Sequence, residues 1–258
     1  MKRTKINVNV QDFPLELQET IARTQIFDSS CSDEARVYFL DCDGGLYLKT
    51  AAKGSLKKEA LMTEYFHSKG LAAEVVEYLS LDRDWLLTSR VTGEDCTHAD
   101  YLSEPERLCD LLSNRLRELH ETDFSDCPIS DHRANYLAVA EENFQKGRCD
   151  VSYFGENCTA AEAWRVLQEG KHLLKNDTLL HGDYCLPNIM LDNWRFSGFI
   201  DLGNGGVGDR HVDIFWGAWT LNFNLGTDAY RQRFFDGYGR DRIDDDILKI
   251  IAAAEVFG

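Results

Sequence analysis

The sequence of 258 residues contains no long apolar run. No segment approaches the roughly 20 apolar residues that a membrane-spanning helix needs. The basic N-terminal stretch MKRTKINVNVQDF also lacks the apolar core of a secretory signal. We therefore expect a cytoplasmic protein without a membrane partner.

Cysteine is present, but not in the patterns that carry a structural role. The eight cysteines are scattered, with no Cys-x-x-Cys pair among them. Zinc sites built on such pairs are therefore excluded, and a compact disulfide scaffold is disfavoured in a chain of this length. We expect reduced thiols, most of them partly buried.

Positive charge is scarce relative to negative charge. Lysine and arginine total 28, against 44 aspartates and glutamates, which gives a formal net charge of −16. A negative field repels the phosphates of nucleic acids and attracts cations. We therefore expect no nucleic-acid partner and a cationic small molecule as ligand, although the same charge could serve solubility alone.

The first third of the chain is patterned as a small sheet with one helix. Two apolar runs in residues 37–51 flank Asp-Gly-Gly, which indicates a hairpin because glycine tolerates the positive φ of tight turns. Residues 56–70 predict a helix that ends at Gly70, with Glu59 on its apolar stripe. Residues 75–89 predict two further strands around a charged turn.

The pattern becomes helical from about residue 104. Leucines recur at helical spacing over residues 104–119, and further helices are predicted over 159–175, 211–222 and 243–256. The predicted fold class is therefore α+β, with a β-rich N-terminal lobe over 1–88 and a helical C-terminal lobe over 94–258. Residues 89–93 are the predicted hinge between the two lobes.

The stretch HGDYCLPN carries the strongest chemical pattern. His181, Asp183 and Asn188 fit the spacing H-x-D-x-x-x-x-N, which kinase-type phosphoryl-transfer enzymes use as their catalytic loop. In such a loop the aspartate orients the acceptor hydroxyl and the asparagine binds magnesium. Pro187 favours a rigid loop over a continued helix, because its φ is fixed and it has no N–H donor.

A second aspartate follows shortly downstream. The apolar run FSGFI leads into Asp201-Leu-Gly203, which matches the Asp-x-Gly that binds magnesium beside the phosphates of the nucleotide. In the alternative interpretation, His181 and Asp183 only satisfy each other in a turn, and Asp201 caps a strand. Because the two patterns occur together, the magnesium-binding interpretation is favoured.

Phosphate binding also requires a positive group. Lys49 falls on the second strand of the predicted hairpin, and Glu59 on the following helix is the expected ion-pair partner for it. No G-x-G-x-x-G precedes the hairpin, which argues against a eukaryotic-type protein kinase. The corresponding stretch, 28–35, contains Ser30 and Ser32, and small polar residues can still offer backbone N–H groups to phosphates.

Taken together, HGD-x4-N and GFIDLG-xx-G-x-x-DR-xx-DI resemble the aminoglycoside 3′-phosphotransferase family. The resemblance spans nearly the whole chain and is strongest over 179–214. It implies a protein-kinase-like two-lobed fold, a requirement for ATP or GTP and Mg²⁺, and O-phosphorylation of a polycationic aminoglycoside that confers resistance.

The resemblance also assigns roles to individual residues. It implies a catalytic set, a nucleotide-binding set, a magnesium-binding pair and a substrate-binding set of acids. The catalytic set is Asp183, Lys49 and Glu59. The nucleotide-binding set is Tyr47, Lys49, Ser89 and Val91, beside the phosphate-loop candidates Ser30 and Ser32. The magnesium-binding pair is Asn188 and Asp201, and the substrate-binding acids are Asp150, Glu156 and Glu255.

Two positions depart from the family pattern. Asn204 stands where the family usually has arginine, and Ala254 stands where it usually has aspartate. The first change removes a positive group near the γ-phosphate, and the second removes a drug-binding carboxylate.

Two other functions remain open. One is a kinase for another hydroxylated molecule, such as choline, homoserine, a sugar or a macrolide, with Trp216 and Trp219 helping to cage a quaternary amine. The other is a nucleotide-binding pseudokinase, against which the presence of Lys49, Asp183 and Asp201 argues.

Overall fold

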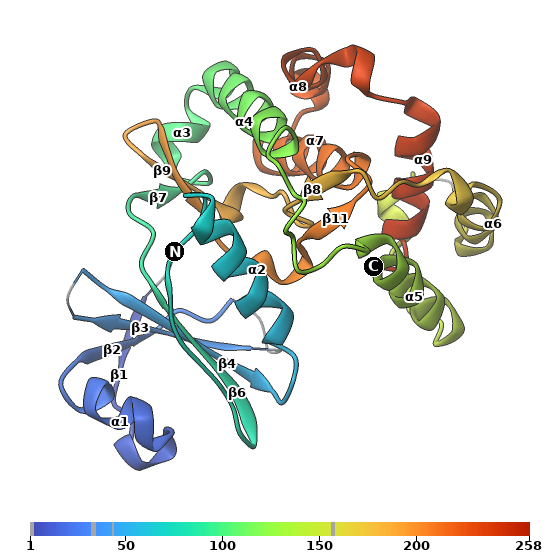
Figure 1. The fold of residues 1–258 in the computed structure, drawn as a ribbon. Helices are drawn as coiled ribbons and strands as arrows, with labels where there is room; N and C mark the ends of the chain where they lie inside the picture. Colours follow the sequence, from blue (N-terminus) through green and yellow to red (C-terminus); the bar gives the residue numbers. More distant parts are fainter. Residues whose placement is uncertain (1–2, 32–34, 43, 156–157) are drawn as a thin grey trace. The chain divides into compact units, whose positions relative to one another are not determined.

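A computed structural model describes residues 3–31, 35–42, 44–155 and 158–258 (Figure 1). The chain forms two compact units. We call the first the sheet unit; it consists of Met1–Asp95 and Ile189–Gly203. We call the second the helical unit; it consists of Cys96–Asn188 and Asn204–Gly258. The lobe boundaries predicted around residues 89–93 stay a prediction.

An antiparallel six-stranded sheet forms most of the sheet unit. Its order across the sheet is β1 (Thr4–Ile6), β2 (Gln25–Asp28), β3 (Arg36–Asp41), β4 (Leu46–Ala52), β6 (Arg83–Ser89) and β5 (Val75–Ser80). The hairpin predicted over 37–51 is confirmed as β3 and β4, and the strands predicted over 75–89 are confirmed as β5 and β6.

The turn between β3 and β4 depends on glycine. Gly44 and Gly45 have φ values of +88° and +93°, a region that residues with a Cβ rarely adopt. A Cβ on Gly45 would also lie 2.8 Å from the Phe39 ring. This turn fixes the register in which Val37 pairs with Lys49.

Two helices cover opposite faces of this sheet. Helix α1 (Leu15–Ala22) buries Leu17 and Ile21 in a cluster with Leu48 of β4. Helix α2 (Lys57–Ser68) packs on the other face, where Ala51 is buried. Because side chains alternate along a strand, Lys49 points to the same face as Ala51, toward α2.

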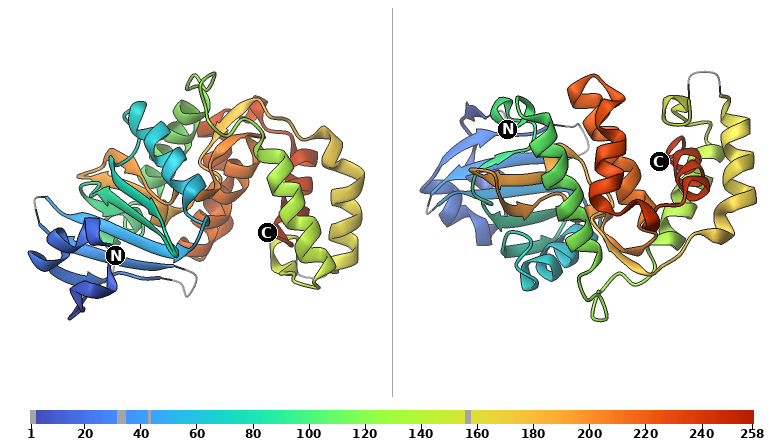
Figure 2. Two further views of the ribbon diagram at one scale, coloured as in Figure 1. Left: turned by 60° about the horizontal axis from the view of Figure 1, so that its bottom comes forward. Right: turned by 90° about the horizontal axis from the view of Figure 1, so that it is seen from above.

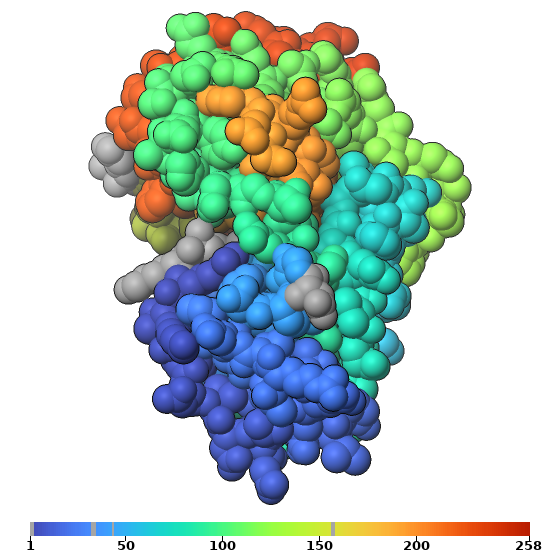
Figure 3. All heavy atoms as spheres, turned by 90° about the vertical axis from the view of Figure 1, so that its left-hand side faces the viewer, coloured from blue at the N-terminus to red at the C-terminus, as the bar shows by residue number. Residues whose placement is uncertain are grey.

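A three-stranded sheet completes the sheet unit. It consists of β7 (Glu94–Asp95), β9 (Ile189–Asp192) and β10 (Arg195–Phe199), with β9 in the centre. Figure 3 shows the orange residues of β9 and β10 against the green residues around β7, as this pairing requires. The strand before Asp201 is thus anchored in the sheet unit.

The helical unit contains the helices of the C-terminal half and a two-stranded sheet. They are α3 (Ala99–Leu102), α4 (Pro105–His120), α5 (His132–Gln145), α6 (Ala160–Gly170), α7 (His211–Leu225), α8 (Arg231–Tyr238) and α9 (Asp245–Glu255), with β8 (Thr178–Leu180) and β11 (Gly206–Gly208). Figure 2 shows α6 and α9 side by side, and an apolar cluster joins them to α5 and α7.

The four helices predicted for this half are confirmed as α4, α6, α7 and α9. Of the five leucines predicted to form the apolar stripe of α4, four are buried and Leu111 is half-buried; the buried ones are Leu108, Leu112, Leu116 and Leu119.

All eight cysteines are free thiols, as their spacing predicts. Within the described ranges, no helix combines the length and the apolar character needed to cross a membrane.

Candidate functional site

Lys49 lies at the centre of an ion cluster in the sheet unit. Its Nζ lies 2.8 Å from Glu59 Oε2 and 2.6 Å from Asp201 Oδ1. Burial opposes the charged form, but the carboxylates of Glu59 and Asp201 outweigh it and raise the pKa of Lys49. The predicted pairing of Lys49 with Glu59 is therefore present, and the lysine is held as an ammonium ion.

The two carboxylates of this cluster differ in exposure. The Glu59 side chain is 11% exposed, whereas that of Asp201 is 52% exposed. Asp201 has φ +60°, a left-handed conformation that is uncommon for residues with a Cβ and concentrates at functional sites. Glu59 thus anchors Lys49 inside the unit, while Asp201 keeps oxygen atoms accessible to a ligand.

The predicted base-binding residues lie nearby in the sheet unit. Tyr47 and Val91 line one pocket of about 150 Å³, together with Arg3, Arg90, Gly93, Glu94 and Met190. Arg3 donates to the Tyr47 hydroxyl at 2.7 Å. The backbone N–H of Ser89 donates to Glu74 at 2.9 Å.

The stretch proposed for phosphate contacts is only partly described. The Ser30 N–H donates to Asp28 Oδ1 at 2.9 Å, and the Ser30 hydroxyl accepts from the Val37 N–H at 3.0 Å. Ser32 lies outside the described residues. In this conformation Ser30 stabilises its own turn.

The catalytic-loop residues lie together in the helical unit, between β8 and the 3-10 turn Leu186–Asn188. The amide Nδ2 of Asn188 donates to Asp183 Oδ2 at 2.8 Å and to the Asp183 main-chain oxygen at 3.1 Å. Gly182 has φ +83°, and a Cβ there would lie 2.1 Å from the Asn204 carbonyl oxygen. The loop therefore requires glycine before the aspartate.

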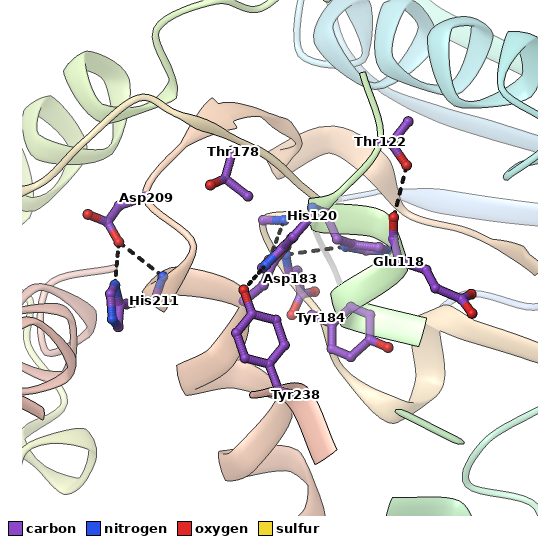
Figure 4. Close-up of polar contacts among 12 residues, drawn as sticks. Glu118, His120, Thr122, Thr178, Asp183, Tyr184, Asp209, His211 and Tyr238 are labelled. Atoms are coloured by element: carbon purple, nitrogen blue, oxygen red, sulfur yellow. Dashed lines mark hydrogen bonds and ion pairs between the residues drawn. The ribbon is translucent and has the colours of Figure 1, made fainter. Parts of the chain in front are cut away.

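A buried carboxylate on α7 holds this loop. Asp213 is fully buried and accepts the backbone N–H groups of His181 and Gly182, each at 2.8 Å. It also lies 3.2 Å from His120 Nε2, and His120 Nδ1 lies 2.8 Å from the Tyr238 hydroxyl (Figure 4). Burial lowers the pKa of His120, so the ring is neutral at pH 7.

One residue of the network that holds the catalytic loop lies in a recognisable sequence pattern. Asp213 is the second aspartate of the pattern DR-xx-DI, but the spacing of that pattern does not indicate a contact with the catalytic loop. His120 lies 93 positions from Asp213 and 118 positions from Tyr238 in the sequence, so local spacing gives no sign of these contacts.

A second histidine–carboxylate pair secures the start of α9. Asp209 Oδ1 lies 2.6 Å from His211 Nδ1 (Figure 4). His211 Nε2 accepts the backbone N–H of Asp244 at 2.9 Å. Asp209 also accepts the Lys175 N–H at 2.9 Å. Because one ring nitrogen accepts a hydrogen bond, His211 is neutral, with its proton on Nδ1.

Two of the three predicted substrate-binding acids are described. Glu255 is only 6% exposed, and its Oε1 accepts from the Tyr136 hydroxyl at 2.7 Å and from Trp216 Nε1 at 3.2 Å. Asp150 is exposed and accepts the Ser152 N–H at 3.0 Å, while its own N–H donates to Val256 at 2.8 Å. Glu156 lies outside the described residues.

Comparison with known proteins agrees with these features. Residues 25–248 match the model of the phosphotransferase enzyme family. A probable aminoglycoside 3′-phosphotransferase of Lactococcus lactis is 51% identical over 257 residues, covering 98% of both chains. The chain belongs to the aminoglycoside 3′-phosphotransferase family. An aminoglycoside 3′-phosphotransferase of Niallia circulans is 32% identical over 67% of each chain.

Solved structures of aminoglycoside phosphotransferases share the fold. An aminoglycoside phosphotransferase of Streptomyces rimosus superposes with a TM-score of 0.75 at 20% identity, covering 98% of this chain and all of that chain. A type VIII aminoglycoside 3′-phosphotransferase has a TM-score of 0.70 at 22% identity and covers 99% of this chain and 94% of its own. The predicted α+β, protein-kinase-like fold is confirmed.

Asn188 in the helical unit and Asp201 in the sheet unit each offer an oxygen donor of the kind that the magnesium implied by the phosphotransferase family prefers. Because Asn188 donates through Nδ2, its amide Oδ1 remains as the acceptor atom. The Asp201 side chain keeps half of its surface exposed.

Proposed function

We propose that this protein transfers the γ-phosphoryl group of ATP, or of GTP, to a hydroxyl of an aminoglycoside antibiotic and so confers resistance. The observation that carries the proposal is the contact of Lys49 with both Glu59 and Asp201 in the sheet unit. Kinase-type enzymes require this lysine–glutamate pair and this aspartate for phosphoryl transfer. The relatives named above support aminoglycosides as the acceptors.

In this proposal the sheet unit binds the nucleotide. Lys49, kept charged by Glu59, contacts the α- and β-phosphates, and Tyr47 stacks on the base. Backbone groups of Ser89 and Val91 hydrogen-bond the edge of the base. A solved Streptomyces rimosus relative contains ADP, which supports a nucleotide as ligand.

Asp183 is the proposed catalytic residue. Its carboxylate accepts a hydrogen bond from the acceptor hydroxyl, orients the oxygen toward the γ-phosphorus and receives the proton on transfer. Asn188 keeps the carboxylate in place through the 2.8 Å hydrogen bond. Asn188 and Asp201 would hold Mg²⁺, which neutralises charge on the phosphates when bound.

The proposed acceptor is a polycation. Asp150 and Glu156 are the candidates for direct contact with its ammonium groups, because charge-assisted hydrogen bonds are the strong ones. Glu255, the third acid of the predicted set, is only 6% exposed and already accepts from Tyr136 and Trp216. The net charge of −16 adds long-range attraction. A solved Streptomyces rimosus relative was determined with streptomycin, which supports an aminoglycoside at the acceptor site.

The proposal includes a cytoplasmic location, where ATP is available. The eight free thiols support it, because reducing compartments keep cysteines unpaired.

A phosphorylation screen tests the function. Purified protein is incubated with Mg²⁺ and either ATP or GTP, against kanamycin, neomycin, choline, homoserine and a macrolide, and products are identified by the mass of one added phosphoryl group. We expect kanamycin and neomycin to be phosphorylated, and nuclear magnetic resonance of the product to locate the phosphate at the 3′ position.

Asp183→Asn is the matched control, since it preserves the shape of the side chain and removes the proton acceptor. Phosphorylation of choline or homoserine, without any aminoglycoside product, would replace the proposal with a metabolite kinase. Nucleotide binding without any phosphorylated product would favour a pseudokinase.

A further inference from the structure

One face of α7 lines a cavity, although Phe215 on that face also packs against the apolar cluster of the helical unit and Ala218 is buried. The cavity lies within the helical unit and has a volume of about 710 Å³. Its α7 wall consists of Phe215, Ala218, Trp219 and Asn222, at the helical spacing i, i+3, i+4 and i+7. In a globular protein such a mostly apolar stripe normally faces the core. The part of the stripe that lines the cavity is therefore a candidate ligand-binding surface.

Aromatic rings are concentrated at this wall. The Trp219 ring lies 5.3 Å from Trp216, 5.7 Å from Tyr153 and 4.9 Å from Phe223 between centroids. Phe223 stacks on Trp219 at an interplanar angle of 13° and is 70% exposed. A large aromatic side chain with that exposure is not held there by core packing. We call Tyr153, Trp216, Trp219 and Phe223 the aromatic wall; Tyr153 and Trp219 line the cavity, and Trp216 and Phe223 contact the Trp219 ring.

The charged residues around the cavity are balanced. Three carboxylates and three cations line it: Glu162, Asp228 and Asp245, and Arg165, Arg231 and Lys249. Glu162 already accepts from Thr159 at 2.8 Å, and Asp245 pairs with Arg240 at 2.6 Å. A cationic ligand would therefore meet no excess of carboxylates here, and the aromatic faces provide an additional attraction for it.

The aromatic wall is connected to the proposed acceptor site. Trp216 donates its indole N–H to Glu255 at 3.2 Å, and Asp150 precedes the 3-10 turn Val151–Tyr153, whose last residue is in the wall. Burial raises the pKa of Tyr153, and the charges of Asp150, Glu255 and Asp183 add to the rise.

We propose that Trp219 is a specificity-determining residue whose indole face binds an ammonium-bearing ring of the acceptor, remote from the hydroxyl that reacts. A cation over a tryptophan face is attracted by the ring quadrupole, and the attraction strengthens where water is excluded. The inference rests on the proposed function and deepens it: the favoured acceptors carry a cationic second ring that reaches the aromatic wall.

The test replaces Trp219 with two apolar residues that differ in aromaticity. Trp219→Phe keeps an aromatic face, whereas Trp219→Leu fills similar space without one. We expect Trp219→Leu to raise the KM for kanamycin about tenfold and Trp219→Phe about threefold or less. The kcat and the KM for ATP should stay within about twofold of wild type, because the wall does not touch the reacting atoms.

Trp164→Leu is the matched control. Trp164 stacks on Phe144 at 4.0 Å and does not line the cavity, so its loss should leave the KM for kanamycin unchanged. An equal rise in the KM for the Phe and Leu variants would overturn the inference in favour of packing alone. An unchanged KM in both variants would also overturn it.

A direct measurement of binding distinguishes a failure of this inference from a failure of the proposed function. Calorimetric titration of kanamycin into wild type and Trp219→Leu requires no catalysis, and we expect about tenfold weaker binding in the variant. If wild type phosphorylates no aminoglycoside, the proposed function fails, and the titration still decides whether the wall binds one. Equal affinity of both proteins, or no binding by wild type, overturns the inference.

Discussion

Asn188 donates an amide hydrogen to Asp183 Oδ2 across 2.8 Å, within one loop of the helical unit. Its second contact, to the Asp183 main-chain oxygen at 3.1 Å, fixes the amide so that Oδ1 points away from the aspartate. One side chain thus orients the proposed proton acceptor and offers an oxygen ligand to a cation. Variants of either residue should therefore lower the rate of phosphoryl transfer more than the affinity for the nucleotide.

Asp183→Asn should lower kcat by about a thousandfold or more, because the amide cannot accept the proton of the hydroxyl. The affinity for ATP should change by less than about threefold, since Asp183 acts on the acceptor and not on the nucleotide. Steady-state kinetics and a fluorescent-nucleotide titration measure the two quantities. A variant that retains a tenth of wild-type turnover would refute the role of Asp183.

Glu59→Gln should raise the KM for ATP about tenfold while the KM for kanamycin stays unchanged. Lys49 would lose the carboxylate 2.8 Å away and turn toward Asp201, away from its position for the phosphates. Glu64→Gln, at an exposed position on the same helix, is the matched control. Equal effects of both variants on the KM for ATP would contradict the positioning role of Glu59.

Local spacing predicted those parts of the structure that depend on neighbouring residues. The β3–β4 hairpin follows from Asp-Gly-Gly, and the partner of Lys49 follows from Glu59 on an apolar helical stripe. Helix α5 was missed because its sequence buries few side chains, among them His132 and Ala140, and so shows little periodicity.

The support of the catalytic loop depends on residues distant in sequence. His120 on α4 meets Asp213 on α7, 93 positions away, and spacing cannot predict such a contact. The burial of Glu255 was likewise not evident, because its partners Tyr136 and Trp216 come from α5 and α7. The position of Lys49 within an ion cluster was predictable, and the shielding of Glu255 was not.

Asp213→Ala should lower the free energy of unfolding by about 3 kcal/mol, since it leaves the buried N–H groups of His181 and Gly182 without an acceptor. For a chain of this length that corresponds to a fall in Tm of about 6–12 °C. Scanning calorimetry measures it. Asp236→Ala, at an exposed position on α8, is the control and should shift Tm by less than about 2 °C.

Glu255 should make stability depend on pH in a defined window. Burial raises the pKa of its carboxyl to about 7, against the hydrogen bonds from Tyr136 and Trp216. The folded protein therefore keeps the proton between about pH 4.5 and pH 7, where the unfolded chain has lost it. The resulting stabilisation is complete below pH 4.5 and is lost as the pH rises through 7.

Glu255→Gln isolates this effect, because the amide oxygen can still accept from Tyr136 and Trp216 but cannot titrate. The free energy of unfolding of wild type, relative to Glu255→Gln, should fall by about 3 kcal/mol from pH 4.5 to pH 7.5. Tyr136→Phe removes a hydrogen bond that favours the charged form, so it should move the window to higher pH. Urea unfolding at several pH values gives the free energy of unfolding of all three proteins. If this free energy depended on pH in the same way for wild type and Glu255→Gln, Glu255 would not titrate in this range.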